Sequence, residues 1–351
     1  MSTGIAILGA GIFARDEHLP AVQACSLFSL KAIYSRSQES ADKLAQDAAN
    51  PVDIYFDSPC TSGRSLDDLL KRDDVDAVTI ALPILVQPEV IKKALGAGKQ
   101  VLSEKPIAKD VDTAAEMVRW YKDTRQEQIW SVGENFRFLD SVTFGAEQIR
   151  RLGGNVVAFG LKVYGFIDEN EKYYQTEWRQ TPKYQGGFLL DGGIHFVASL
   201  RYLLAAAGQS ITQVTSFTSL LQPHLAPLDT INAMVKVENE NGGQFCLSFG
   251  VEFKTDFEIQ VVTDRGAVTV LPTEVAVLTK DADGERSERR VRVRPGSAVK
   301  AEMAAFAESI RTGKSDPRGT PEQALADLQV LQAMLESGEE AGAVKKVQCA
   351  T

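Results

Sequence analysis

The sequence predicts an α/β domain with a doubly wound parallel sheet, followed by an α+β domain with a large, mostly antiparallel, open sheet. The chain has 351 residues, of which 44% are hydrophobic and 24% are charged, a length and composition suited to two globular cores. Strand-like and helix-like segments alternate in its first third, whereas strand-like segments follow one another in its second half. The first pattern is typical of parallel sheets and the second of antiparallel ones.

The N-terminal domain is expected over residues 1–135. Short apolar runs there are rich in β-branched residues, as in buried strands, and the stretches between them have the spacing of amphipathic helices. The expected strands are Ile5–Leu8, Leu30–Tyr34, Ala77–Leu82, Gln100–Leu102 and Ile129–Val132. The expected helices are Glu39–Ala48, Pro88–Ala97 and Val111–Asp123. This alternation implies right-handed βαβ units covered by helices on both faces.

The second domain is expected over residues 136–351. Turn signals such as Glu240-Asn241-Gly242-Gly243 separate its strand-like runs,. The expected strands are 155–165, 211–221, 230–238, 243–253, 257–263, 267–271 and 274–279. Two helices, Val299–Arg311 and Glu322–Ser337, close the chain, and we expect them to pack back toward the first domain.

Charge and cysteine usage restrict the partners and the compartment. The net charge of −9 is poorly suited to nucleic acid or anionic membranes. The four cysteines are widely spaced, as expected for reduced thiols rather than a disulfide framework or a zinc site: Cys25, Cys60, Cys246 and Cys349,. The N-terminus has no basic segment followed by an apolar one, and no apolar run reaches about 20 residues,. We therefore expect a cytoplasmic protein that binds neither nucleic acid nor membranes and has no metal site.

A glycine-rich turn follows the first expected strand. Its sequence, Gly9-Ala10-Gly11-Ile12-Phe13-Ala14, has the spacing G-x-G-x-x-A. Gly9 permits the tight turn, Gly11 lets the backbone approach a pyrophosphate, and Ala14 lets helix and strand pack closely. Glycine pairs also form plain turns, but this one lies between a strand and a helix at the start of βαβ units. It predicts a dinucleotide-binding Rossmann domain, with the phosphates at a helix N-terminus.

The end of the second strand favours NADP over NAD, although NAD is also compatible with the fold. Enzymes that use NAD usually place an acid there, on the ribose 2′-hydroxyl. This chain has Ser35-Arg36-Ser37 instead. Arg36 can bind a 2′-phosphate with two N–H groups, and the serine hydroxyls can donate further hydrogen bonds. The alternative is that Arg36 is a solvated loop residue.

Further candidate residues follow the fourth and fifth strands, whose carboxyl ends face the ligand crevice in such a sheet. Ala81, Leu82, Pro83 and Gln87 are predicted neighbours of the cofactor, as is Glu104. Lys105, within Ser103-Glu104-Lys105-Pro106, can hydrogen-bond a substrate oxygen and assist proton transfer. Most lysines are surface residues, but the position of Lys105 in the crevice and the proline that follows it favour this role.

A second titratable group is predicted on a helix in the C-terminal domain. Asp191 and His195 are four residues apart, so a helix there would put both on one face. A carboxylate beside an imidazole can move a proton on and off a carbinol oxygen near neutral pH. Alternatively, Asp191 is a helix N-cap and His195 a hydrogen-bonded core histidine.

In combination, these motifs resemble the Gfo/Idh/MocA family, the glucose–fructose oxidoreductase and inositol dehydrogenase group. The resemblance rests on G-x-G-x-x-A at 9–14, Glu-Lys-Pro at 104–106 and Asp-x-Gly-x-His at 191–195. It extends to Gly133-Glu134-Asn135-Phe136-Arg137 and to Trp178-Arg179, and so covers nearly the whole chain.

The resemblance implies an NAD(P)-dependent dehydrogenase or reductase acting on a sugar, a polyol or a related small molecule. It implies that Lys105 contacts substrate and nicotinamide through a strand end with a cis Lys105–Pro106 peptide, and that Asp191 and His195 complete the proton-handling group. Arg137, Trp178 and Arg179 would lie on the substrate side, with Tyr184 a weaker candidate. Family members often form dimers or tetramers through the open sheet face, so a homo-oligomer is implied.

Two departures from the family pattern leave other functions open. Gln87 stands where many relatives have a histidine, and Ala198 where many have an acid. A first alternative is reduction of a C=N bond or a conjugated pyrrole, which the apolar segment Ile84–Val86 also favours. A second alternative is a non-catalytic NADP-sensing regulator; retention of both Lys105 and His195 argues against it.

Overall fold

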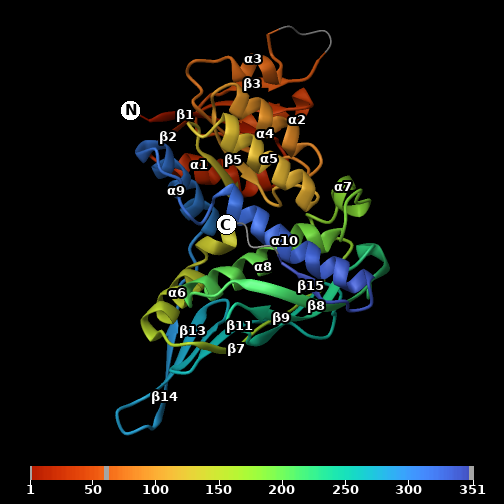
Figure 1. Cartoon of the computed structure of the whole chain (residues 1–351). Helices are drawn as coiled ribbons and strands as arrows, with labels where there is room; N and C mark the ends of the chain where they lie inside the picture. Colours follow the sequence, from red (N-terminus) through yellow and green to blue (C-terminus); the bar gives the residue numbers. More distant parts are fainter. Residues whose placement is uncertain (1, 59–62, 348–351) are drawn as a thin grey trace. The chain divides into compact units, whose positions relative to one another are not determined.

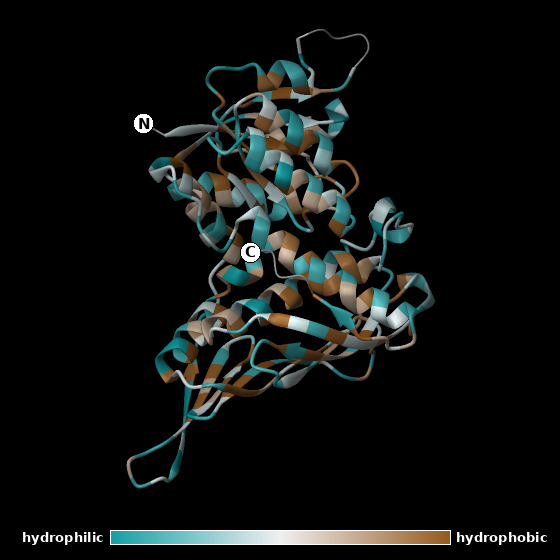
Figure 2. Cartoon of the chain, in the orientation of Figure 1, coloured by the Kyte–Doolittle hydropathy of each residue, from teal (hydrophilic) through white to brown (hydrophobic). Residues whose placement is uncertain are grey.

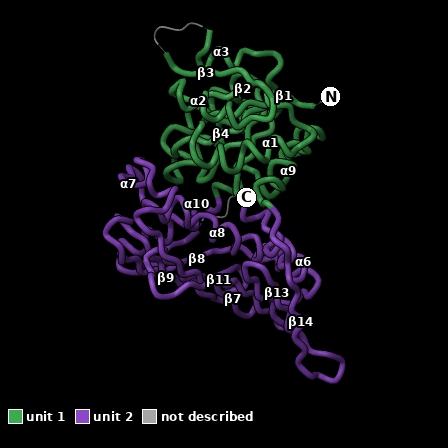
Figure 3. Tube along the Cα trace, turned by 180° about the vertical axis from the view of Figure 1, so that it is seen from behind, with its two compact units in different colours: residues 1–134, 297–325 green, residues 135–296, 326–351 purple. Residues whose placement is uncertain are grey.

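The computed structural model describes residues 2–58 and 63–347 and divides into two compact units (Figures 1 and 3). Unit 1 comprises residues 1–134 and 297–325, and unit 2 comprises residues 135–296 and 326–351. The expected boundary at residue 135 lies next to the observed one. The expected second domain is interrupted, however, because one of its closing helices belongs to unit 1.

Unit 1 is built on a sheet of six parallel strands in the order β3-β2-β1-β4-β5-β6. This is the strand order of a dinucleotide-binding Rossmann sheet, whose topological switch lies between β1 and β4. The fold class predicted for the N-terminal domain is thus confirmed. The strands are β1 (Thr3–Leu8), β2 (Phe28–Ser35), β3 (Asp53–Phe56), β4 (Ala77–Ile80), β5 (Gln100–Glu104) and β6 (Trp130–Gly133).

The helices of unit 1 include every one expected from periodicity and several short ones that were not. The expected helices are α2 (Gln38–Gln46), α4 (Gln87–Gly96) and α5 (Val111–Thr124). The others are a π-helical turn η1 (Ala14–His18), α1 (Leu19–Ala24) and α3 (Leu66–Leu70). Segments of five or six residues show too little periodicity to be recognised.

The helix α9 (Ala298–Thr312) completes unit 1 although it lies far along the chain. Its apolar side chains Val299, Met303 and Phe306 share a buried cluster with Ile5 of β1 and Val22 of α1. An amphipathic stripe predicts that a helix is covered on one face, but not by which element. The sequence therefore predicted this helix but not the core to which it contributes.

Unit 2 is built on a sheet of nine strands in the order β14-β13-β12-β11-β7-β10-β9-β8-β15. All neighbours are antiparallel except β7 and β10, which are parallel. The prediction of a large, mostly antiparallel sheet is confirmed. The strands are β7 (Val156–Tyr164), β8 (Ile211–Ser219), β9 (Thr230–Val237), β10 (Gly242–Ser248), β11 (Asp256–Thr263), β12 (Gly266–Val270), β13 (Glu274–Lys280), β14 (Arg286–Arg292) and β15 (Lys345–Lys346).

Two edge strands of this sheet, β14 and β15, were not predicted. In β14 nearly every residue is exposed and four of seven are arginines. A strand exposed on both faces lacks the apolar alternation by which strands are recognised, which explains why it was missed. Apolar and polar residues do alternate along the inner strands (Figure 2).

The helices of unit 2 include one long apolar helix, α8 (Phe188–Ala206), which packs with α6 and β11. By length and composition α8 could cross a membrane, but most of it is buried within the protein, as is usual for a core helix. The remaining helices are the 3₁₀ turn η2 (Asn135–Phe138), α6 (Asp140–Leu152), α7 (Glu177–Gln180), the 3₁₀ turn η3 (Pro223–Leu225) and most of α10 (Pro321–Glu339).

Two of the four cysteines lie within the described residues. Cys25 and Cys246 are free thiols, whereas Cys60 and Cys349 lie outside the described residues.

Candidate functional site

The two glycines of the G-x-G-x-x-A turn have different surroundings. Gly9 has a φ of 109°, and a Cβ there would lie 2.3 Å from the carbonyl oxygen of Ala81. Gly9 is therefore required by the protein's own backbone. Gly11 does not adopt a left-handed φ, and no described atom lies within 4 Å of its Cβ position. The space beside Gly11 is free for a ligand, which fits a pyrophosphate.

The helix that follows this turn brings Ile12 and Phe13 to partly exposed positions and buries Ala14 completely. A small residue at position 14 thus allows the close packing expected of the fingerprint. Its continuation, η1, ends at a buried histidine, His18, which sequence analysis did not select.

At the carboxyl end of β2, Arg36 is exposed, and its guanidinium makes no hydrogen bond or ion pair within the described residues. Ser35 ends the strand. Ser37 is the N-cap of α2, because its hydroxyl oxygen accepts a hydrogen bond from the amide of Ser40 at 3.3 Å. The guanidinium of Arg36 is thus available to a phosphate. The hydroxyl oxygen of Ser37 already accepts a hydrogen bond from the first turn of α2.

Gln87, the first residue of α4 after strand β4, is 1% exposed, and neither amide atom of its side chain has a hydrogen-bond partner among the described residues. An unsatisfied buried amide is costly, on the order of 1–3 kcal/mol, and such groups usually mark a missing water or ligand. Ala81, Leu82 and Pro83 precede it and are partly exposed. These residues fit a polar ligand at this strand end.

At the carboxyl end of β5, Lys105 is partly exposed and the Lys105–Pro106 peptide is cis, as the family resemblance implied. The side chain of the preceding Glu104 is 12% exposed, and its Oε1 lies 2.8 Å from Nε2 of His18. The opposite nitrogen of His18 lies 2.8 Å from the hydroxyl oxygen of Thr79. Contact of Glu104 with a cofactor stays a prediction.

In unit 2, Asp191 and His195 both lie on α8, as predicted. Asp191 is buried and accepts a hydrogen bond of 2.6 Å from Nε of Arg179. The guanidinium carbon of Arg179 lies 4.0 Å from the ring centroid of Trp178. Together these three residues form a charge-assisted pair with a cation–π contact. Asp191 is thereby held in place as the hydrogen-bond acceptor of Arg179.

The imidazole of His195 stacks on Phe136, with the ring centroids 4.3 Å apart and the planes 15° apart. This contact fixes the plane of the ring on the face of α8. Phe136 belongs to the Gly-Glu-Asn-Phe-Arg segment that carried the family resemblance, although sequence analysis gave it no role of its own.

Arg137 was predicted on the substrate side, but its side chain is 2% exposed and forms an ion pair with Asp327 of α10. Arg201 of α8 pairs with the same carboxylate. The shared carboxylate of Asp327 compensates the buried charge of Arg137, so removing this carboxylate would leave a buried charge in unit 2 without its ion-pair partner,. The role of Arg137 as a substrate ligand stays a prediction; Asp327, 190 residues away, gave no signal in the sequence.

Tyr184 lies beside Trp178, with the ring centroids 6.3 Å apart. Its hydroxyl is buried and has no hydrogen-bond partner among the described residues. Burial raises the pKa of this hydroxyl, the charge of Asp191 raises it further, and Arg179 lowers it. Tyr184 is therefore a neutral donor at neutral pH.

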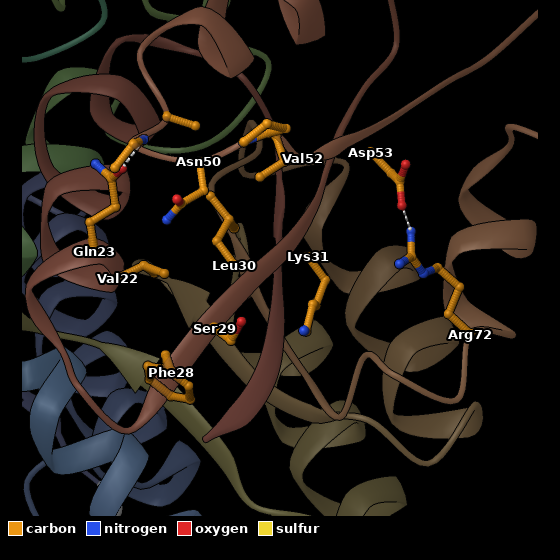
Figure 4. A pocket seen from close by; sticks show the side chains of 13 residues that line it. Val22, Gln23, Phe28, Ser29, Leu30, Lys31, Asn50, Val52, Asp53 and Arg72 are labelled. Carbon is orange, nitrogen blue, oxygen red and sulfur yellow. Dashed lines mark hydrogen bonds and ion pairs between the residues drawn. The ribbon is translucent and has the colours of Figure 1, made fainter. Parts of the chain in front are cut away.

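A cavity of about 530 Å³ lies elsewhere in unit 1, at the amino ends of β2 and β3 (Figure 4). Its lining includes Ser29 and Lys31 of β2, together with Asp53 and Arg72, which form an ion pair of 2.6 Å. The predicted cofactor residues follow the carboxyl ends of the strands instead, and none of them lines this cavity.

Comparison with known proteins decides the family. Residues 3–133 match the oxidoreductase family with an NAD-binding Rossmann fold, and residues 147–346 match the C-terminal alpha/beta domain of the same family.

The chain belongs to the Gfo/Idh/MocA oxidoreductase family.

Relatives of this Gfo/Idh/MocA oxidoreductase match it along nearly its whole length. Dehydrogenase FPY6 from Fusarium mangiferae is 49% identical over 98% of this chain and 99% of its own length. A D-xylose 1-dehydrogenase (NADP(+)) from Haloferax volcanii is 25% identical over 97% and 98%. The crystal structure of an oxidoreductase from Thermotoga maritima is 29% identical, with a TM-score of 0.85 and 99% of each chain covered. The protein is thus a nicotinamide-dependent oxidoreductase.

As a member of the Gfo/Idh/MocA family, the chain has its candidate residues in two groups, one in each unit. Unit 1 contributes the glycine turn, Arg36, Gln87 and the Glu104–Lys105 strand end. Unit 2 contributes Trp178, Arg179, Asp191 and His195. Within unit 1 the residues fit a dinucleotide, because the space beside Gly11 is free and the buried amide of Gln87 lacks a partner.

Proposed function

We propose that the protein transfers hydride between NADP(H) and a carbinol or carbonyl carbon of a sugar, a polyol or a related small molecule. The bound nicotinamide supplies or accepts the hydride. The observation that carries the choice of NADP is Arg36, an exposed guanidinium without an ion pair among the described residues at the end of β2, where NAD enzymes usually have an acid,. A relative named for NADP(+) and a sugar supports the same choice.

The cofactor would be held by groups of unit 1. Gly9, Gly11 and the helix start at Ile12, Phe13 and Ala14 would hold the pyrophosphate, and Ser35, Arg36 and Ser37 the 2′-phosphate. The amide of Gln87 would hydrogen-bond polar atoms near the nicotinamide, which would satisfy its buried donor and acceptor,. Ala81, Leu82, Pro83 and Glu104 would line the same strand ends.

The substrate oxygen would be handled by Lys105 and His195. The ammonium group of Lys105 would donate a hydrogen bond to this oxygen and favour developing negative charge on it. His195 would exchange the hydroxyl proton. Asp191, held by Arg179 at 2.6 Å, would orient these groups, with Trp178 and Arg137 on the substrate side.

The test uses purified protein, NADPH and a panel of aldoses, ketoses and anhydrosugars, with absorbance at the nicotinamide band as the readout. We expect turnover of at least one sugar and a fall in kcat of about 10²–10⁴-fold for Lys105→Ala, the usual contribution of a positioned acid or base. Lys109→Ala, a neighbouring exposed lysine, is the matched control. Turnover by Lys105→Ala near the wild-type rate would show that the assigned role is wrong.

A second candidate substrate is a C=N bond or a conjugated pyrrole. Leu85 and Val86, which follow β4, are exposed apolar side chains, as an apolar substrate would favour. Cyclic imines and tetrapyrroles therefore belong in the same panel. Turnover of these compounds without turnover of any sugar would select this candidate.

We also propose that a second copy covers the open face of the nine-stranded sheet. Phe217 of β8 and Met234 of β9 are both exposed. Phe217 is paired with Asn232 of β9, and Met234, two residues further along β9, points to the same face,. Apolar side chains grouped on one sheet face are typical of an interface. Sedimentation equilibrium should give a dimer or tetramer, and Met234→Glu should lower the mass; a wild-type monomer would contradict this assembly.

A further inference from the structure

His18 connects three elements of unit 1 through its imidazole. The side chain is completely buried on η1, directly after the glycine turn. Its Nδ1 lies 2.8 Å from Oγ1 of Thr79 on β4, and its Nε2 lies 2.8 Å from Oε1 of Glu104 at the end of β5. Phe13 packs edge-on against the ring, with centroids 5.2 Å apart. Both ring nitrogens of this histidine therefore have partners inside the domain.

The partners determine which nitrogen donates. An ionised Glu104 can only accept, so Nε2 of His18 carries the hydrogen of this bond. Nδ1 then accepts from the hydroxyl of Thr79 if the ring is neutral, or donates to it if the ring is charged. In both forms Glu104 receives a hydrogen bond from a ring that cannot reorient, because its other nitrogen is held as well.

A second carboxyl group, that of Glu302, lies near Gly133 together with the carboxyl group of Glu104. The Cβ position of Gly133, at the end of β6, is 3.3 Å from Oε1 of Glu104 and 3.4 Å from Oε2 of Glu302 on α9. Glu302 is itself buried. The two carboxyl groups lie near the same glycine, and a fixed hydrogen-bond donor to Glu104 favours the charged form of its carboxyl group there.

We propose that His18 is a positioning residue for Lys105, acting through the carboxylate of Glu104. Glu104 is the last residue of β5 and Lys105 leaves the strand directly after it. Anchoring the Glu104 side chain on His18 fixes the backbone from which the lysine extends. Placement of a reacting group within a fraction of an ångström strongly affects catalysis. The consequence for catalysis rests on the proposed function of Lys105, whereas the anchoring itself does not.

The alternative is that His18 only fills the core. Two amide substitutions separate these possibilities, because glutamine places an amide near the Nε2 position of histidine and asparagine near its Nδ1 position. His18→Gln can still donate to Glu104. His18→Asn can still reach Thr79 but leaves Glu104 without its donor. A merely structural role predicts similar effects of both.

The experiment measures the reactivity of the Lys105 amine by competitive labelling with trace acetic anhydride and peptide mass spectrometry. Lys99 is the internal reference, because it is buried in the same unit and donates to the carbonyl oxygens of Arg72 and Val75. We expect His18→Asn to raise the labelling of Lys105 relative to Lys99 by about threefold or more, as loss of a hydrogen bond to a charged group would allow. His18→Gln should remain near wild type.

His224→Gln is the matched control, because His224 is a largely buried histidine of unit 2 whose Nε2 lies 2.8 Å from the carbonyl oxygen of Ile167. It should leave the labelling of Lys105 unchanged. Equal labelling of Lys105 in wild type and His18→Asn would overturn the proposal. So would equal increases in His18→Asn and His18→Gln.

If His18→Asn does not fold, Glu104→Gln and Glu104→Ala replace it. Both substitutions remove the charge of Glu104, but only glutamine keeps an oxygen that accepts a hydrogen bond from His18. Lys105 should therefore be more reactive in Glu104→Ala than in Glu104→Gln. Equal reactivity of Lys105 in the two variants would overturn the proposal. The outcome is independent of turnover. Full activity of Lys105→Ala would remove the proposed catalytic role of the lysine and leave the anchoring intact.

Discussion

Replacing Gly11 with alanine should weaken NADPH binding without lowering the stability of the protein. Replacing Gly9 with alanine should first of all lower the stability. The two positions lie in one turn, two residues apart. A Cβ on Gly9 would lie 2.3 Å from the carbonyl oxygen of Ala81, whereas a Cβ on Gly11 would meet no described atom within 4 Å. The same substitution thus tests the fold at one site and the ligand space at the other.

The expected cost of Gly9→Ala has two parts. A non-glycine residue held at a φ of 109° is strained by about 1–3 kcal/mol,. Overpacking against a backbone atom, which cannot move aside as a side chain can, costs about 1–3 kcal/mol more. A total of about 3 kcal/mol would lower the melting temperature of a unit of this size by about 10 °C.

For Gly11→Ala the unfolding free energy should stay within about 1 kcal/mol of wild type, or rise, because alanine restricts the unfolded chain. The methyl group would instead occupy the space of the pyrophosphate. Loss of one backbone hydrogen bond to a charged phosphate costs about 2 kcal/mol, which corresponds to about a 30-fold increase in Kd.

The assays are thermal unfolding by calorimetry and titration of NADPH fluorescence, with NADH measured in parallel. Gly96→Ala is the control, because the Cβ position of this glycine of α4 also meets no described atom within 4 Å and its φ is not positive. If Gly11→Ala has as low a melting temperature as Gly9→Ala, glycine at position 11 is required by the fold and not by the ligand. If Gly11→Ala binds NADPH as wild type does, the phosphate assignment fails.

Three further results are expected. Arg36→Ala should weaken NADPH by about 10–100-fold, the worth of one charge-assisted pair, and NADH hardly at all; equal weakening of both cofactors in titrations would contradict the choice of NADP. Tyr184→Phe should leave the melting temperature unchanged or slightly higher, because the buried hydroxyl has no partner among the described residues, and should raise KM for a hydroxylated substrate; a clear loss of stability would disprove this view. Burial raises the pKa of Asp316, but its hydrogen bonds from Arg318 outweigh this and hold it below the ordinary 3.8. Asp316 therefore stabilises the protein above that pH and less as the pH falls further, so Asp316→Asn should lower the urea midpoint at pH 7 and lose this difference near pH 2; an equal difference at both values would exclude this linkage.

Sequence reasoning was strongest where one short segment contains the whole signal. The glycine turn, the strand–helix alternation of unit 1 and the spacing of Asp191 and His195 on one helix all follow from local sterics and periodicity. It was weakest at strand ends and edges. β4 ends at Ile80 and not at Leu82. The polar strand β14 was missed because its exposed residues do not alternate between apolar and polar,.

The sequence by itself thus determined that a parallel and a mostly antiparallel sheet are present, where the dinucleotide turn lies and to which family the chain belongs, because these are encoded in local periodicity and in short motifs. Only the tertiary structure showed that α9 completes the core of unit 1, that Arg137 is paired with Asp327, and that His18 holds Glu104. Such pairings join side chains 86 or 190 residues apart. Their partners are selected by the burial of charge and by three-dimensional packing, which leave no periodic trace in the order of the residues.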